Sequence, residues 1–320
     1  MNRLGDALSS SKPQPRSTRL AATRLLVAMS LVVSLVAAAL LVNHTHRQPK
    51  KAAVVSVEHG NRQLRVLLVG DSMAGTLGVG LAKAAPASGI TLIDAALGGC
   101  GVADAWAGGA PVDITVPARP GPPCQNSAQL TAYWEGFLRL YHPQVVIYAS
   151  RVDTIPEEVT SGSTHRMTSL LEPSFQAGFR TALTQAVDVL SSTEAHVILT
   201  TSTPTKVDDP TRWAIYDSIV DSVAAQSLGR ATVFDLGRFF GANAADPVFR
   251  LLSPAGIQWR CTDGIHFTEA GGVLVAPSLF GTAWQYWTTQ QTSDPPVPRS
   301  IANQPWAPFA SHAAVLGCLA

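Results

Sequence analysis

The sequence predicts an α/β protein in which helices cover both faces of a five-stranded parallel sheet, forming a three-layer α/β/α sandwich. Two observations favour this class. Short apolar runs of strand length alternate with longer segments whose apolar residues recur at helical spacing, an order typical of a parallel sheet covered by helices. The chain has 320 residues, which is enough for one such domain behind a separate N-terminal region.

Strands and helices are expected to alternate along the domain. The apolar runs predict strands at residues 65–69, 91–96, 145–149, 196–201 and 232–236. Helical spacing predicts a helix that begins near Met73 and further helices at 131–141, 175–190, 213–226 and 271–290. In an open parallel sheet the ligand site lies beyond the carboxyl ends of the strands, so we expect it in the loops that follow them.

An N-terminal apolar run, residues 25–42, carries no charge and follows several arginines. About eighteen predominantly apolar residues are enough to cross a bilayer. The run is longer than the core of a cleaved signal peptide and ends without a small-residue cleavage site, so we expect an uncleaved transmembrane signal anchor. The predicted organisation is a cytoplasmic segment at 1–24, the anchor at 25–42, a linker at 43–63, the domain at 64–291 and an irregular tail at 292–320.

Four cysteines indicate on which side of the membrane the domain lies. Basic residues flank the anchor on both sides, so charge bias alone discriminates weakly between its two orientations. The cysteines have no metal-like spacing and fit two disulfides in an exported domain, so we expect a cytoplasmic N-terminus and an extracytoplasmic domain at the cell membrane. The preferred pairing is Cys100 with Cys124 and Cys261 with Cys318; the other pairings, and reduced buried thiols, stay open.

Two short motifs, far apart in the chain, point to catalysis. Gly70-Asp71-Ser72 follows the first expected strand, and the sequence Asp-Gly-Ile-His runs from Asp263 to His266. A serine hydroxyl needs a neutral imidazole within hydrogen-bond reach and a third group that orients the imidazole. Taken alone, Ser72 also fits a helix N-cap and His266 a surface or core histidine. Their occurrence together, in this order, favours a Ser72–His266–Asp263 triad.

The two motifs resemble those of the SGNH (GDSL-type) hydrolase superfamily, over about residues 64–287. The sequence CTDGIHFT at 261–268 is most similar to SGNH domains attached to, or working beside, membrane acyltransferases of cell-envelope glycans. The resemblance implies a flavodoxin-like fold and an acyl-enzyme on Ser72. It also implies that the backbone N–H groups of Ser72 and Gly99 bind the oxyanion, although Gly99 equally fits a turn that requires positive φ.

The third motif of the family is where this sequence departs from the pattern. Most members have Gly-x-Asn-Asp after the third strand, whereas this chain has Tyr-Ala-Ser-Arg-Val-Asp at 148–153, without asparagine. Ser150 or Arg151 is the candidate for the missing side-chain donor, and Arg151 equally fits a salt bridge at the rim. The missing asparagine keeps a non-catalytic interpretation open.

These observations predict a membrane-anchored, extracytoplasmic serine esterase or O-acyltransferase. Its expected substrates are O-acyl groups, above all acetyl, on cell-envelope polysaccharide or glycolipid, and a membrane acyltransferase is an expected partner. The alternative is a catalytically weak SGNH-fold protein that binds glycan or assists such an acyltransferase. A net charge of +1 and 14% charged residues give no indication of nucleic-acid binding. We expect no metal and no cofactor, because metal-ligand spacings and a P-loop lysine are missing, and the Ala- and Val-rich composition suggests a bacterial source.

Overall fold

The computed structural model describes residues 63–103, 109–111, 124, 126–161, 164–205, 209–241, 251–253, 256–290 and 318. The chain divides into two compact units, Met1–Glu58 and His59–Ala320, and all the described residues belong to the second. The anchor predicted at 25–42 and the segments that flank it up to residue 62 lie outside the described residues. The tail predicted at 292–320 also lies outside them, apart from Cys318. Within the described residues, no helix is long and apolar enough to cross a membrane.

Five parallel strands form the main sheet, as the sequence predicts. Their order is β2-β1-β4-β7-β8, the flavodoxin-like order in which the first strand lies between the second and the third. The strands are β1 (Leu64–Gly70), β2 (Ile90–Asp94), β4 (Val145–Ala149), β7 (His196–Thr200) and β8 (Ala231–Phe234). The second strand ends two residues before the predicted end, where the Asp94 side chain accepts a hydrogen bond from the N–H of Ala96.

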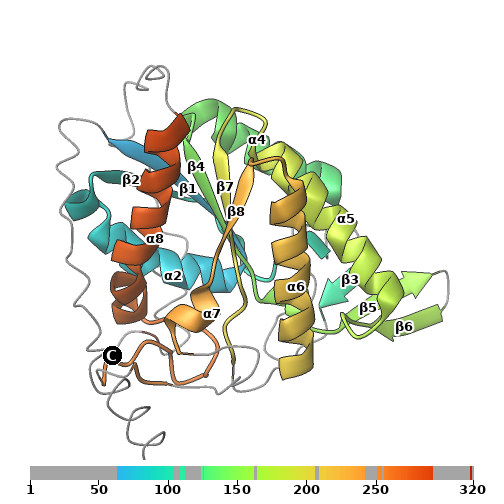
Figure 1. Ribbon diagram of the computed structural model, residues 1–320. Helices are drawn as coiled ribbons and strands as arrows, with labels where there is room; N and C mark the ends of the chain where they lie inside the picture. The colour runs from blue at the N-terminus through green and yellow to red at the C-terminus, as the bar shows by residue number, and fades with distance from the viewer. Residues whose placement is uncertain are drawn as a thin grey trace, which may run out of the picture. The chain divides into compact units, whose positions relative to one another are not determined.

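Helices cover both faces of this sheet (Figure 1). One face packs against α4 (Ser127–Tyr141), α5 (Pro173–Leu190) and α6 (Pro210–Gln226), and the other against α2 (Ser72–Ala84), α7 (Leu236–Phe239) and α8 (Glu269–Gln290). Successive residues of β1 alternate between the two cores: Leu67 and Val69 face α4–α6, whereas Val66 and Leu68 face α2 and α8. This period of two is the geometry of an extended strand that is buried on both sides.

Helices α2 and α8 approach each other at the level of the backbone. A Cβ atom on Gly80 of α2 would lie 2.2 Å from the carbonyl oxygen of Glu269, and one on Gly272 of α8 would lie 2.7 Å from the Cα of Gly80. Both distances are too short for a side chain, so glycine at these positions permits the contact. The pairing matters for the site because α2 begins at Ser72 and α8 follows the segment that contains His266.

A small antiparallel sheet was not predicted from the sequence. It consists of β3 (Gly109–Pro111), β5 (Glu157–Ser161) and β6 (Thr164–Thr168), in the order β3-β5-β6. The sequence does carry a signal for the β5–β6 hairpin, because Gly162-Ser163 separates two segments that contain β-branched residues. The strand at 109–111 is short, and no local pattern marks it.

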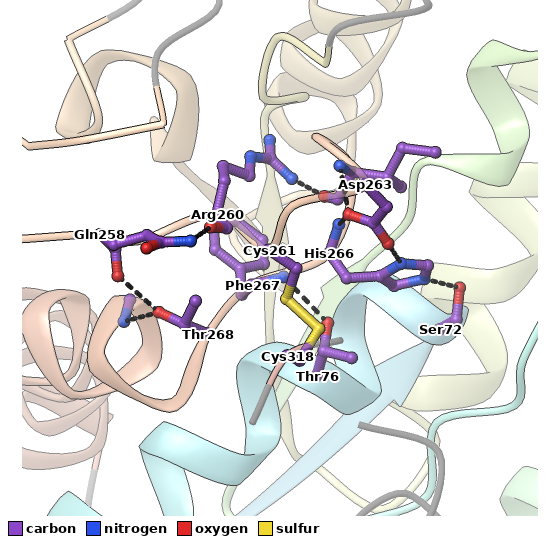
Figure 2. Close-up of a disulfide and its surroundings, with 12 residues drawn as sticks. Ser72, Thr76, Gln258, Arg260, Cys261, Asp263, His266, Phe267, Thr268 and Cys318 are labelled. Carbon is purple, nitrogen blue, oxygen red and sulfur yellow. Dashed lines mark hydrogen bonds and ion pairs between the residues drawn. A yellow bond between two sulfur atoms is a disulfide. The ribbon is translucent and has the colours of Figure 1, made fainter. Parts of the chain in front are cut away.

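Two disulfides join the cysteines in the preferred pairing, Cys100 with Cys124 and Cys261 with Cys318. No cysteine is left free. The first bond lies in the core that faces α4–α6. The second lies beside His266, as Figure 2 shows.

Candidate active site

The first site residue, Ser72, is placed by a tight turn at the carboxyl end of β1. Gly70 has a φ of +132°, and a Cβ there would lie 1.8 Å from the carbonyl oxygen of Ala149 in β4, so only glycine fits. Asp71 caps α2, since its Oδ1 accepts a hydrogen bond of 2.8 Å from the N–H of Met73. Ser72 is therefore the first residue of α2, at the edge of the sheet where sequence analysis expects the site.

The three residues predicted as a triad lie in one hydrogen-bonded chain (Figure 2). Nε2 of His266 is 2.9 Å from Oγ of Ser72, and Nδ1 of His266 is 2.6 Å from Oδ2 of Asp263. A proton on Nδ1 is donated to the carboxylate, which leaves Nε2 free to accept the serine proton. The side chain of His266 is only 11% exposed, so the imidazole is largely shielded from bulk water.

Asp263 is held as a carboxylate by the turn in which it lies. Burial by itself raises the pKa of this group, but hydrogen bonds from the His266 ring and from the N–H groups of Ile265 and His266 outweigh burial and lower the pKa below its usual value. Its Oδ1 accepts the two backbone bonds, at 2.8 and 3.1 Å. Oδ2 is thereby directed at the imidazole.

The two predicted oxyanion donors lie in turns at the carboxyl ends of neighbouring strands. Gly99 follows β2 and has a φ of +69°, in a turn closed by a hydrogen bond from the N–H of Cys100 to the carbonyl of Leu97. The turn interpretation of Gly99 is thus correct, and it is compatible with the oxyanion role. Within the described part of the chain, no group accepts a hydrogen bond from the N–H of Ser72 or of Gly99.

The turn after β4, which replaces the usual asparagine motif, is tied to the nucleophile turn. Oδ2 of Asp71 accepts hydrogen bonds from the N–H groups of Arg151 and Val152, at 2.7 and 2.6 Å. Ser150 is buried, and its Oγ lies 3.5 Å from the N–H of Asp153, at the limit of a hydrogen bond. Ser150 and Arg151 therefore lie in the turn bonded to the residue next to Ser72, and their role as a third donor stays a prediction.

Asp153 connects that turn to the segment that follows Gly99. Its Oδ1 accepts a hydrogen bond of 3.0 Å from the N–H of Ala103, and its Oδ2 accepts one of 2.5 Å from the hydroxyl of Tyr148. Burial raises the pKa of Asp153 to about 6, although these hydrogen bonds act in the opposite direction. Asp71 and Asp153 together link the turns after β1, β4 and β2. From the sequence, Asp71 fits a helix N-cap, which the structure confirms, but no role in linking the turns was predicted for either carboxylate.

Two further residues, which were not predicted from the sequence, hold the His266 segment in place. Oγ1 of Thr76, one turn into α2, accepts a hydrogen bond of 3.2 Å from the N–H of Phe267. Arg260, before the Cys261–Cys318 disulfide, is fully buried and donates to the carbonyl of Ile265. A charged residue between tryptophan and cysteine was the available signal for Arg260, and Thr76 had none. In the described part of the chain, no cluster of three or more potential metal ligands occurs.

Comparison with known proteins identifies the family of the chain. The family model of the SGNH domain, described as fused to AT3 domains, matches residues 43–279 of the chain. The search of curated proteins found no match to the chain. Among solved structures, TesA is 16% identical, with a TM-score of 0.42 over 70% of this chain and 98% of that chain. The esterase EstA from a Pseudoalteromonas species is 14% identical (TM-score 0.42; 70% and 98%), and the acetyl xylan esterase AlAXEase is 15% identical (TM-score 0.43; 68% and 99%).

The family model covers well over half of the chain, and it confirms the resemblance drawn from the two motifs. The fold and the family together define the protein as an SGNH serine hydrolase. The chain belongs to the SGNH domain family whose members are described as fused to AT3 domains.

Proposed function

We propose that the chain transfers acyl groups through a covalent ester on Ser72, as an esterase or an O-acyltransferase. The observation that carries the proposal is the Ser72–His266–Asp263 chain, with hydrogen-bonding distances of 2.9 and 2.6 Å. Oγ of Ser72 attacks the acyl carbonyl while its proton passes to Nε2 of His266. The N–H groups of Ser72 and Gly99 bind the developing oxyanion. The tetrahedral intermediate then collapses, the bond to the alcohol breaks, and His266 protonates that alcohol.

The second half of the reaction decides between the two activities. Water or a sugar hydroxyl attacks the acyl-Ser72 carbonyl, His266 takes the proton of the attacking group, and the ester bond to Oγ breaks with return of that proton to Ser72. Hydrolysis releases a free acid, and transfer yields a new ester. The residues of the triad serve both outcomes equally, because they act on the same acyl-enzyme.

The proposed substrates are O-acyl groups, chiefly acetyl, of cell-envelope polysaccharide or glycolipid. The family description, which refers to fusion with AT3 domains, supports an acylated substrate and an association with an acyltransferase. Two disulfides favour an oxidising, extracytoplasmic location. The uncharged run at 25–42 favours a membrane anchor with the N-terminus in the cytoplasm. Together these features favour a domain that works at the outer side of the membrane.

The first test is the release of p-nitrophenol from p-nitrophenyl acetate by the full-length protein in detergent, compared with Ser72→Ala. Removal of the nucleophile is expected to lower kcat on the order of a thousandfold or more. Ser192→Ala is the control. Ser192 is exposed in the turn between α5 and β7, so it lies at the end of the sheet opposite Ser72. Equal release by wild type and Ser72→Ala would contradict the proposed chemistry and favour an accessory or glycan-binding role.

A second measurement separates hydrolase from transferase. The same reaction is run with and without a xylo-oligosaccharide acceptor, and the products are identified by mass spectrometry. An acetylated acceptor formed by wild type and absent with Ser72→Ala indicates transfer. Free acetate alone, in both conditions, indicates an esterase.

A further inference from the structure

Arg260 is a charged residue with no exposed surface, directly before the segment that contains Asp263 and His266. Burying a cation costs free energy, and hydrogen bonds to the guanidinium offset part of that cost. The guanidinium carbon of Arg260 packs over two adjoining aromatic rings, 4.7 Å from the ring centroid of Trp259 and 4.5 Å from that of Phe267. This stacking holds the plane of the guanidinium in one orientation.

The guanidinium group joins segments that are distant in the sequence, and its Nη1 lies 3.6 Å from Sδ of Met73, at the start of α2. Nη1 donates to the carbonyl of Ile265, the residue before His266. Nη2 donates to Oγ1 of Thr203, and also to the carbonyls of Thr203 and Pro204 at 3.2 and 3.1 Å. Thr203 and Pro204 lie in the loop that follows β7, an interior strand of the sheet, so Arg260 attaches the backbone beside His266 to this loop.

The other hydrogen bonds of the His266 segment either lie within its own turn or join it to α2. The bond from the N–H of Cys261 to the carbonyl of His266, at 2.8 Å, closes the turn on itself, as do the bonds accepted by Asp263. Thr76 attaches the far side of the turn, at Phe267, to α2. Arg260 attaches the Ile265 side of the turn to the loop after β7. Figure 2 shows the bond from Arg260 to the turn.

We propose that Arg260 is a positioning residue for the reaction, which acts by keeping His266 within hydrogen-bond reach of Ser72. The proposal rests on the proposed acyl transfer. Arginine suits this task because one planar group donates several hydrogen bonds in fixed directions while it also packs against aromatic rings. Lysine lacks the planar fork, and methionine fills the space without donating. A shift of the histidine by about 1 Å is enough to cost about a hundredfold in rate.

The matched control is Arg65, another buried arginine that donates to backbone carbonyls. It is 3% exposed, and its guanidinium bonds to the carbonyls of Tyr141 and His142 at the end of α4. Arg65 lies near the start of β1, at the end of the sheet opposite Ser72. Its replacement removes a buried cation without touching the site.

The experiment compares full-length wild type, Arg260→Met, Arg260→Lys and Arg65→Met by steady-state hydrolysis of p-nitrophenyl acetate. The concentration of active sites is measured by titration with a fluorophosphonate, so that partial unfolding does not lower the apparent kcat. For Arg260→Met we expect a kcat about tenfold to a hundredfold lower, with KM changed less than about twofold. The kcat of Arg260→Lys is expected to lie between those of Arg260→Met and wild type. Arg65→Met is expected to keep the wild-type kcat per active site.

A milder variant covers the case in which Arg260→Met does not fold. Thr203→Val removes one acceptor of Arg260 with little change in volume, and it is expected to lower kcat about twofold to tenfold at constant KM. Wild-type kcat in both Arg260→Lys and Thr203→Val, or equal losses in Arg260→Met and Arg65→Met, would overturn the positioning role. Wild-type activity that does not depend on Ser72 would instead overturn the proposed function, so the two failures are distinguishable.

Discussion

Three aspartates at the carboxyl ends of the strands differ in pKa because their surroundings differ. Asp263 accepts three hydrogen bonds, which outweigh burial and lower its pKa. Burial dominates at Asp153, whose pKa is raised to about 6, and at Asp94, whose pKa is raised to about 7. Asp94 has one opposing hydrogen bond, from the N–H of Ala96. Asp153 is completely buried whereas Asp263 is partly exposed, so the depth of burial decides which effect is larger for these two carboxylates.

The raised pKa of Asp94 predicts a pH-dependent stability. Between about pH 4 and about pH 7 the folded protein holds a proton that the unfolded chain has lost, so the stability that this proton supplies declines as the pH rises through that interval. Asp94→Asn removes this dependence. The free energy of unfolding of the variant, measured by urea denaturation, is expected to rise relative to that of wild type when the pH is raised from about 5 to about 8.

The control for this change is Glu194→Gln, which removes a carboxylate from an exposed turn after α5. Its difference from wild type is expected to stay nearly constant over the same pH interval. A constant difference for Asp94→Asn as well would contradict the raised pKa of Asp94.

At the scale of elements, the contact between α2 and α8 sets the distance across the site. Ser72 begins α2, and His266 precedes α8 by a short segment, so the spacing of the two helices governs the spacing of nucleophile and base. Gly80 and Gly272 allow the backbones to touch. A methyl group at this contact would push the helices apart rather than fill a void.

Gly80→Ala is therefore expected to destabilise the fold by about 1–3 kcal/mol through overpacking, and to lower kcat because Ser72 and His266 move apart. Gly136→Ala, within α4, is the control. No atom lies within 4 Å of a Cβ built there, so alanine is expected to stabilise α4 by about 0.5–1 kcal/mol and to leave kcat unchanged. Thermal denaturation and p-nitrophenyl acetate hydrolysis measure the two effects. Equal stability of both variants would show that the α2–α8 contact has room for a side chain.

At the scale of the whole molecule, each disulfide connects a loop at the site to a distant part of the chain. Cys100 follows Gly99 and pairs with Cys124, and Cys261 precedes Asp263 and pairs with Cys318. The two bonds therefore restrain the oxyanion turn and the histidine turn respectively. Their sequence separations, 24 and 57, determine how much each bond restricts the unfolded chain.

Replacing both cysteines of one pair by serine is expected to lower the free energy of unfolding. Chain entropy predicts a loss of about 4 kcal/mol for Cys261→Ser with Cys318→Ser, and about 3 kcal/mol for Cys100→Ser with Cys124→Ser. Urea denaturation without reductant measures the free energy of unfolding of both double variants. Wild type denatured with reductant is the reference for loss of both bonds. An unchanged stability in either double variant would contradict the corresponding bond.

Local patterns predicted most of the main sheet and its helices. The five strands and the helices were recognisable because apolar periodicity is a property of neighbouring residues. The end of the second strand was misplaced by two residues because the turn there depends on the Asp94 side chain. The small sheet was missed because its strands are short and carry no continuous apolar run.

The sequence by itself determined the class of fold, the family motifs and the identity of Ser72, His266 and Asp263 as candidates, because these depend on local periodicity and on the order of short motifs. Tertiary structure alone decided that Oγ of Ser72 and Nε2 of His266, 194 residues apart, lie 2.9 Å from each other. It also decided which of the possible disulfide pairings forms. Finally, it decided that Arg260 joins the Ile265 carbonyl to the loop after β7. Such contacts arise from the packing of distant segments against one sheet, and no local pattern in the chain encodes that packing.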